Sequence, residues 1–365
     1  MTARRATGRP TGAATAALAV AATTAALILG FLVRPVAGPL PSDRAGDAAL
    51  AERARDVLGP DRPALAVACV SRAVTRTAAV GAQLSDRFEI GSISKGLTGL
   101  LFADMIRRGE VRPETRVGEL LPLDGGVGAI TLEQLATHRS GLPVQLLTGR
   151  QVVINYASAL TAGNPYGRST ARLLHDLRDA ELTSPPGTYS NVGFELLGAA
   201  LAAAAERPYP ELITERILRP AGLTEATVPV SRDQLDPGDL IGETAGGRQA
   251  DPWLGEAMGP AGGVRADITG MAALAAALLG GTAPGADALI PRAPYGDESI
   301  GWAWITTPMA GTGRSVVWHN GGTGGFTAFL GLDRGAERAV VVLSAVGETP
   351  NAATEAGFRL LEEGC

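Results

Sequence analysis

The spacing of hydrophobic and polar positions changes twice along the chain. Strand-like apolar runs lie toward both ends of the main body, at residues 64–74, 77–82, 299–307, 315–318, 325–332 and 339–345. Helix-like runs broken by glycine and proline dominate the part between them, and further helices flank it, at residues 48–58, 96–106, 131–141, 169–181, 194–206, 210–217, 268–279 and 355–363. The pattern predicts an α/β (α+β) fold. In it the N- and C-terminal strands share one antiparallel sheet flanked by helices, and residues from about 110 to 280 form a mainly helical middle subdomain.

A different pattern marks the N-terminus. Residues 13–33 are uncharged and apolar, and as a helix this run would reach roughly 30 Å, enough to cross a bilayer core. Arg4, Arg5 and Arg9 precede the run, which favours an N-terminus inside and a body outside the cytoplasm. A cleaved signal peptide is the alternative, in which case the protein is secreted. The expectation is a single-pass protein of the cell membrane, attached through an N-terminal transmembrane helix.

These patterns divide the chain into three parts. Residues 1–37 are the expected membrane anchor or signal segment, and residues 38–47 form a linker rich in proline, glycine, serine and aspartate. Residues 48–365 form the expected globular domain. The sequence leaves open whether the N-terminal segment is cleaved and which oligomeric state the protein adopts.

Charge and composition exclude several partners. The net charge is −5 and no basic run occurs beyond the N-terminus, so nucleic acid is not an expected partner. The three histidines are scattered and Cys69 and Cys365 lie far apart, so no metal-ligand spacing is present. No nucleotide-binding loop is apparent either, and we expect neither a metal nor a cofactor. Whether the two cysteines form a disulfide is open.

Lysine usage singles out one residue. Of the 32 basic residues, 31 are arginine and only Lys95 is lysine. Arginine does not give up its proton in proteins, whereas a buried lysine can. Ser92 lies three residues before Lys95, so a helix that starts at Ser92 places both side chains on one face. The pair is therefore a candidate nucleophile with its base, although a helix cap followed by a solvated charge has the same pattern.

Two further segments carry candidate chemistry. Tyr189 and Asn191 precede a predicted helix, where a phenol can relay a proton and an amide can hold a carbonyl; an ordinary helix-capping turn is the alternative. His319 opens a glycine-rich segment after a strand, and such glycines let a ligand approach the backbone closely. His138 and His175 lie in separate predicted helices and are interpreted as structural residues.

The order of Ser-x-x-Lys, Tyr-x-Asn and His-x-Gly resembles the serine β-lactamase and penicillin-binding protein superfamily. It is closest to the class C-like branch, which includes D-Ala-D-Ala carboxypeptidases and related esterases. The resemblance covers about residues 48–360, with supporting stretches at 130–143, 190–198 and 262–267. It implies that residues 48–365 are a β-lactamase-like serine hydrolase domain.

The resemblance also implies roles for individual residues. Ser92 would be the acylated nucleophile and Lys95 its base. Tyr189 would share or relay the proton, and which of Lys95 and Tyr189 takes it first stays open. Asn191 would contact both the substrate amide and Lys95. The backbone N–H groups of Ser92 and Gly322 would form the oxyanion hole.

The edge strand that would face Ser92 departs from the β-lactamase pattern. His319, Asn320 and Gly321 would bind substrate there, at the position where class C β-lactamases carry Lys-Thr-Gly. A histidine with a pKa near 6.5 is mostly neutral at about pH 7.5. We therefore expect turnover of a substrate that bears a carboxylate to fall as the pH rises past about 7.

Together these residues predict an extracytoplasmic serine hydrolase that acts through an acyl-enzyme on Ser92. The substrate would be a small molecule or short peptide: a D-Ala-D-Ala-like peptide, an ester or a β-lactam. The sequence does not choose among them, so an esterase of the same fold is one alternative. A non-catalytic protein that binds penicillin or cell-wall fragments is another, although the complete motifs and the single lysine argue against it.

Overall fold

The computed structural model describes Thr24 and residues 37–146, 148–309, 311–348 and 351–364. Residues 37–365 form a compact unit distinct from residues 1–36. Apart from Thr24, the expected membrane segment lies outside the described residues, as does Cys365, so the anchor stays a prediction and the pairing of the two cysteines stays open. In the part of the chain that is described, no helix combines the length and apolar character needed to cross a membrane.

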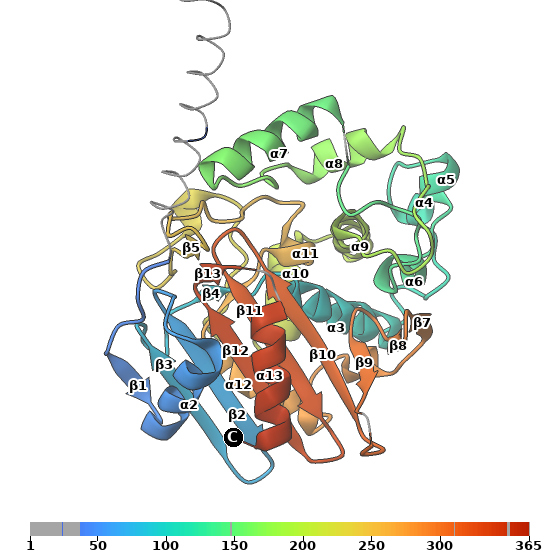
Figure 1. Ribbon diagram of the computed structural model, residues 1–365. Coiled ribbons are helices and arrows are strands. Elements are labelled where there is room, and N and C mark those ends of the chain that lie inside the picture. Colours follow the sequence, from blue (N-terminus) through green and yellow to red (C-terminus); the bar gives the residue numbers. More distant parts are fainter. Residues whose placement is uncertain (1–23, 25–36, 147, 310, 349–350, 365) are drawn as a thin grey trace, which may run out of the picture. The chain divides into compact units, whose positions relative to one another are not determined.

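A nine-stranded antiparallel sheet forms the centre of the body (Figure 1). In spatial order its strands are β1 (Arg44–Gly46), β3 (Thr75–Val80), β2 (Leu65–Ser71), β12 (Arg338–Ser344), β11 (Thr327–Asp333), β10 (Ser315–Gly322), β9 (Ile305–Pro308), β8 (Glu298–Ile300) and β7 (Ala293–Tyr295). Strand β12 pairs with β2, placing Val341 opposite Ala68. The prediction that strands from both ends of the body share one antiparallel sheet is thus confirmed.

Two local predictions about the strands were wrong. The single strand expected at residues 299–307 is divided into β8 and β9, because the chain turns back at Gly301, whose N–H donates to the Trp304 carbonyl at 2.8 Å. Part of the expected linker is instead the edge strand β1, which pairs with β3. Short pairs complete the strands: β4 (Phe88–Glu89) with β6 (Arg265–Ala266), and β5 (Glu243–Thr244) with β13 (Val346–Gly347).

Helices cover both faces of the sheet (Figure 1). The helices α2 (Ala48–Leu58) and α13 (Asn351–Glu363) pack on one face, and α3 (Ile93–Arg107) and α12 (Ile268–Leu279) pack on the other. Side chains of β2 alternate between the two cores: Leu65 and Val67 join the core under α2 and α13, while Ala66 and Ala68 join the larger core. A strand buried on both faces explains its almost continuous apolar sequence.

The middle of the chain is mainly helical, as predicted. Its helices are α4 (Val117–Leu120), α5 (Gly125–Gly128), α6 (Leu132–Ala136), α7 (Gly149–Thr161), α8 (Thr170–Leu177), α9 (Asn191–Ala204), α10 (Tyr209–Ile213) and α11 (Gly259–Gly262), with a π-helix at Thr214–Leu218 and 3₁₀ turns at Arg232–Gln234 and Ala286–Leu289. Thr131 caps α6 as expected, but α6 ends at Ala136, earlier than predicted. Helix α7 was not predicted from the sequence. It buries none of its residues.

Helix α3 is the central helix of the body and is buried almost all round. Glycines allow this close packing. A Cβ at Gly96 would lie 2.7 Å from the Trp304 ring, and a Cβ at Gly99 would lie 2.1 Å from the Trp302 carbonyl oxygen. The Trp304 indole also donates to the Gly96 carbonyl at 3.2 Å. The tight packing fixes the N-terminus of α3, where Ser92 lies.

Candidate active site

Ser92 and Lys95 meet at the N-terminus of α3. Ser92 is the residue before the helix, and the Lys95 Nζ lies 2.9 Å from the Ser92 Oγ. The same Nζ donates to the Ala261 carbonyl at 2.6 Å, which fixes its position. The structure thus brings the two residues together on one face of the first turn, as their spacing predicts.

The environment of Lys95 favours its neutral form. Its side chain is fully buried, and this burial lowers its pKa to about 7. The carboxylate of Glu195 on α9 opposes the shift. A lysine with this pKa can accept a proton at neutral pH, which arginine at the same position could not do.

Tyr189 lies against both residues. Its side chain hydrogen-bonds to Ser92, and its ring centre is 4.8 Å from the Lys95 Nζ. Burial raises the pKa of the Tyr189 phenol, while the hydrogen bond to Ser92 lowers it. The phenol is therefore protonated at neutral pH and can donate a hydrogen bond. This environment leaves Lys95 as the stronger candidate for the first proton transfer from Ser92.

Asn191 makes a different contact from the one expected. It is the first residue of α9, and its Nδ2 donates to the Tyr166 hydroxyl at 3.0 Å. Among the described residues, the side-chain hydrogen bonds of Lys95 go to Ser92 and Ala261, and none joins it to Asn191. Tyr166 lies in the loop between α7 and α8, and its hydroxyl reaches α9, where it accepts the hydrogen bond of the Asn191 amide.

The end of β10 packs directly against the turn that carries Ser92. Gly91 has a positive φ of 51°, and a Cβ there would lie 2.7 Å from the Gly322 backbone nitrogen. A Cβ at Gly321 would lie 2.0 Å from the Ile90 carbonyl oxygen and 3.1 Å from the Ser92 nitrogen. Only glycine permits this approach. It brings the backbone N–H groups of Ser92 and Gly322 close together, as an oxyanion hole requires.

His319 shares the strand face that packs on this turn. It lies two residues before Gly321, and alternate residues of a strand point to the same side. Its side chain is buried, its Nδ1 is 2.6 Å from the Asn320 carbonyl oxygen, and its Nε2 has no hydrogen-bond partner. Burial, together with a smaller contribution from the charge of the nearby Lys95, lowers the pKa of His319 to about 3.

This environment corrects the expected pH dependence. Histidine at its ordinary pKa would change charge near pH 6.5, but buried His319 is neutral throughout the range from pH 5.5 to 8.5. The prediction that carboxylate turnover falls above about pH 7 through His319 deprotonation is therefore wrong. The position of Asn320 also differs from expectation. Its side chain lies on the opposite face of β10 and donates to Thr354 of α13 at 2.9 Å, so it does not reach the site.

His138 belongs to the site's surroundings, which the sequence did not reveal. It lies beyond α6 with a positive φ of 55° and is buried. Its Nδ1 accepts the Ser190 backbone N–H at 3.1 Å, and its ring centre lies 4.5 Å from the Tyr189 ring centre. Burial lowers its pKa well below the ordinary value. His138 thus supports the Tyr189 loop, whereas His175 on α8 is largely exposed, in agreement with its structural interpretation.

Glu195 and Arg168 form a second feature that the sequence did not predict. The two side chains are an ion pair beneath Asn191, and both are almost fully buried. Glu195 lies one helical turn after Asn191 on α9, so both face the same side. The sequence held one signal for this pair. Glu195 lies within an otherwise apolar helix, and a buried glutamate needs a partner.

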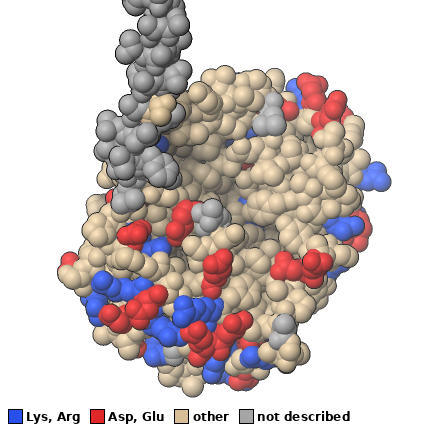
Figure 2. All heavy atoms as spheres, in the orientation of Figure 1, with Lys and Arg blue, Asp and Glu red and all other residues tan. Residues whose placement is uncertain are grey.

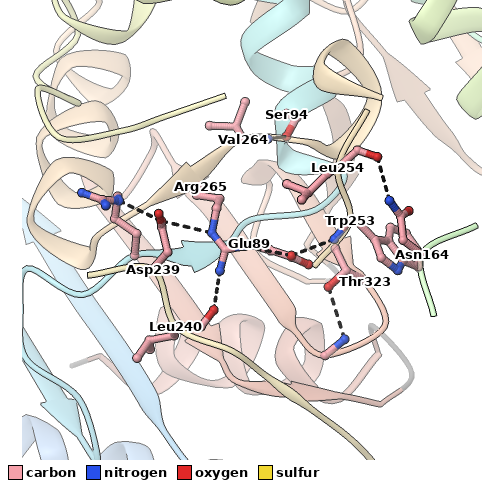
Figure 3. A network of polar contacts seen from close by, with 12 residues as sticks. Glu89, Ser94, Asn164, Asp239, Leu240, Trp253, Leu254, Val264, Arg265 and Thr323 are labelled. Atoms are coloured by element: carbon pink, nitrogen blue, oxygen red, sulfur yellow. Dashed lines mark hydrogen bonds and ion pairs between the residues drawn. The ribbon is translucent and has the colours of Figure 1, made fainter. Parts of the chain in front are cut away.

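A buried ionic network supports the two backbone segments of the site (Figure 3). Glu89, just before the Ser92 turn, accepts from Arg265 at 3.0 Å and from the Trp253 backbone N–H at 3.0 Å, and hydrogen-bonds to Thr323. Asp239 contacts Arg265 on its other side at 3.2 Å. Glu89 therefore links the start of the Ser92 turn to the residue that follows Gly322.

One cavity reaches the Tyr189 loop and another reaches Tyr166, the hydrogen-bond partner of Asn191. The face of the molecule in Figure 2 is hollowed between the helical part and the sheet, with most charged side chains outside the hollow. The cavity beside Tyr189 measures about 750 Å³ and is lined by Gly187, Tyr295 and Glu298 among others. The cavity beside Asn191 measures about 370 Å³ and includes Tyr166 and Trp253.

The fold matches solved structures over most of its length. A class C beta-lactamase from Rhodobacter sphaeroides superimposes with a TM-score of 0.72 at 22% identity, covering 87% of this chain and 98% of that chain. The D-alanine carboxypeptidase AmpC from Burkholderia cenocepacia gives a TM-score of 0.68 at 21% identity, covering 86% and 96%. The sheet and helical part thus define the fold of class C beta-lactamases.

Sequence comparison identifies the family more directly than the fold does. The beta-lactamase family matches residues 49–363, and the chain belongs to this family. One relative is the D-alanyl-D-alanine-carboxypeptidase/endopeptidase AmpH of Escherichia coli strain K12, 31% identical over 163 residues, which are 42% of this chain and 39% of AmpH. Protein flp of Staphylococcus aureus strain MW2 is 27% identical over 156 residues, 40% of this chain and 29% of flp. The matched stretch thus spans well under half of these relatives.

Proposed function

We propose that the protein is a serine hydrolase that forms an acyl-enzyme on Ser92, of the D-Ala-D-Ala carboxypeptidase and β-lactamase-related type. The observation that carries this proposal is the 2.9 Å separation between the Ser92 Oγ and the Nζ of fully buried Lys95. A serine hydroxyl is a weak nucleophile unless an adjacent base accepts its proton. Membership of the beta-lactamase family, whose relatives include a carboxypeptidase, supports the same reaction class.

The proposed reaction begins with attack on the substrate carbonyl. The Ser92 Oγ bonds to the carbonyl carbon while its proton passes to the Lys95 Nζ. The carbonyl oxygen becomes an oxyanion, which the backbone N–H groups of Ser92 and Gly322 stabilise. The tetrahedral intermediate then collapses, the bond to the leaving group breaks, and the leaving group receives a proton relayed from Lys95 through Tyr189. Water then attacks the remaining Ser92 ester and gives a proton to Lys95; as the acyl–oxygen bond breaks, Lys95 returns this proton to the Ser92 Oγ and the acid is released.

The test is the intact mass of the protein after mixing with a penicillin, followed over time. An adduct equal to the mass of the drug, mapped to Ser92 and absent in Ser92→Ala, would support acylation, and its persistence would indicate slow hydrolysis. Disappearance of the drug without an adduct would indicate a β-lactamase. If neither occurs and no ester is cleaved, the acyl-enzyme proposal fails and a purely binding protein takes its place.

We also propose that residues 1–37 hold the domain outside the cytoplasm. Arg4, Arg5 and Arg9 before the apolar run support this orientation. If the segment is an anchor, protease added to intact cells should remove the domain from the cell surface. If the segment is cleaved, the domain should be found in the medium. Full protection, released only by lysis of the cells, would contradict the proposed location.

A further inference from the structure

The outward side of helix α7 carries apolar side chains that no other part of the described chain covers. Val152, Val153, Tyr156 and Leu160 are between 51% and 70% exposed. With 3.6 residues per turn, their spacing places all four within an arc of about 100° around the helix. Four of the nine large apolar side chains that are exposed in the described residues thus lie in one helix of 13 residues. A concentration of this kind marks an interaction surface.

The opposite side of α7 is polar and faces the body. Gln151, Asn155 and Ser158 are half-buried there. Asn155 and Ser158 line the cavity that reaches Tyr166, and the Gln151 Nε2 donates to the Pro165 carbonyl at 2.8 Å. A helix that packs on a core has its apolar side inward, so the polarity of α7 is inverted. Its apolar side can be covered only by a partner outside the domain.

The charged side chains at the two ends of α7 are basic. Arg150 in the first turn is exposed, and Arg248 donates to the carbonyl of the last turn, at Leu160, at 2.7 Å. Neither arginine forms an ion pair within the described residues, and α7 itself contains no aspartate or glutamate. Two neighbouring carboxylates already have cations, in the pairs Asp176–Arg172 and Asp251–Arg232. An apolar side with arginine at both ends matches a phospholipid surface, which offers acyl chains to the first and phosphate groups to the second.

The start of the domain lies next to the end of α7 (Figure 1). The Gly38 N–H donates to the Glu243 carboxylate at 3.0 Å. Glu243 begins β5, and the turn that follows is closed by a hydrogen bond from the Thr244 N–H to the Arg248 carbonyl at 2.8 Å. Arg248 contacts the Leu160 carbonyl, as described above. One short turn therefore joins the first residues of the domain to α7.

The length of chain before Gly38 keeps this edge of the domain close to the proposed membrane span. The apolar run ends at Val33, five residues before Gly38. Five residues reach at most about 18 Å when fully extended, and a headgroup layer is roughly 5–8 Å thick. If the run spans the bilayer, Gly38 therefore lies no more than about 10–13 Å above the headgroup layer.

We propose that the apolar side of α7 lies in the surface of the lipid bilayer, with Arg150 and Arg248 at lipid phosphate groups. This inference rests on the proposed location of the domain beside a membrane anchor, and it gives the anchored domain an orientation. Helix α7 then separates the bilayer from the cavity that reaches Tyr166. The candidate active site thus lies near the membrane surface instead of far above it.

Photocrosslinking from α7 tests the proposal in the full-length protein. The photoreactive residue p-benzoylphenylalanine replaces Tyr156, the protein is reconstituted in vesicles of phosphatidylcholine and phosphatidylglycerol, and adducts are identified by mass after irradiation. The control carries the same residue in place of Val74, which is 54% exposed in the turn between β2 and β3. We expect the yield of lipid adduct at position 156 to be at least roughly fivefold above that at position 74.

Flotation of the vesicles distinguishes failure of this inference from failure of the proposed anchor. A protein that does not float with the vesicles would overturn both. A protein that floats but gives no lipid adduct at position 156, or equal yields at the two positions, would overturn the inference alone. A crosslink from position 156 to a second copy of the chain would overturn it in favour of a dimer.

Two matched variants assign the effect to the apolar side of α7. With the photoreactive residue kept at position 156, Val153→Asp should lower the yield of lipid adduct by at least roughly threefold, because a carboxylate on this side opposes insertion among acyl chains. Val74→Asp makes the same change at the other exposed valine and should leave the yield unchanged. An undiminished yield in Val153→Asp would contradict the proposal.

Discussion

Glu89 and Arg265 form a buried ion pair at the root of the turn that carries Ser92, with 3.0 Å between their side chains. Neither side chain is more than 4% exposed. The pair joins β4 to β6, and Glu89 also contacts Thr323 beyond the end of β10. The pair therefore ties the segment that leads into Ser92 to the residue that follows Gly322.

Removal of Arg265 should destabilise the fold. Arg265→Ala leaves the Glu89 carboxylate buried without its cation, which costs about 3–5 kcal/mol of unfolding free energy. Arg44→Ala is the matched control, because its ion pair with Glu52 is exposed and should contribute less than about 1 kcal/mol. Urea denaturation of both variants measures the difference. Equal losses would contradict a special role for the buried pair.

The sequence was sufficient to pair Ser92 with Lys95 and to locate the sheet, for physical reasons. A three-residue spacing in a helix fixes which side chains meet, so Ser92 and Lys95 could be paired without a structure. The central strands could be located likewise, because the spacing of apolar residues along a strand indicates which side chains it buries. Helix α7 gave no such signal, because apolar residues such as Val152, Val153 and Tyr156 are exposed. Its half-buried face carries the polar Gln151, Asn155 and Ser158.

Other features depend on tertiary packing and could not be read from spacing. His319 has an ordinary sequence environment, and only its burial reveals that it stays neutral. Asn320 faces α13 because the register of β10 places it there, which the glycine-rich sequence does not specify. His138 reaches Tyr189 across about fifty residues of chain, and the Glu195–Arg168 pair is likewise formed between separate segments.

The rate of acylation should follow the ionisation of Lys95. Its pKa of about 7 means that Lys95 is mostly protonated at lower pH and cannot accept the Ser92 proton. We expect kcat/KM for an uncharged ester to fall by about tenfold per pH unit below 7 and to level off above it. The groups that face Lys95 are Glu195, Tyr189, His138 and His319; burial raises the pKa of Glu195 and Tyr189 and lowers the pKa of both histidines.

Two variants test whether Lys95 causes the fall in kcat/KM below pH 7. Lys95→Arg keeps the charge but not the ability to deprotonate, so it should lose at least about a hundredfold in kcat at every pH. His319→Asn should retain the limb near pH 7, since His319 with a pKa of about 3 is already neutral there. A profile that is flat from pH 5.5 to 8.5 in the unmodified protein would rule out Lys95 as the titrating base.

His138 should act as a positioning residue for the Tyr189 loop. His138→Ala removes the acceptor of the Ser190 N–H and the ring against Tyr189, so we expect kcat to fall by roughly tenfold or more. His138→Asn should recover part of the loss, because an amide oxygen can accept the same N–H. His175→Ala, at an exposed position, is the control and should leave kcat unchanged. Equal activity of the alanine variants at both positions would show that the loop does not need His138.

The contact between Gly321 and the Ser92 turn tests the oxyanion hole directly. Gly321→Ala would place a Cβ 2.0 Å from the Ile90 carbonyl oxygen, and the end of β10 must move away to relieve this clash. The Gly322 N–H would move with it, so we expect the acylation rate to fall by about 10²–10³-fold. Gly149→Ala is the matched control, because a Cβ there meets no atom within 4 Å. Thermal unfolding shows whether each variant is folded, and a folded Gly321→Ala protein that acylates at the full rate would exclude the end of β10 from the oxyanion hole.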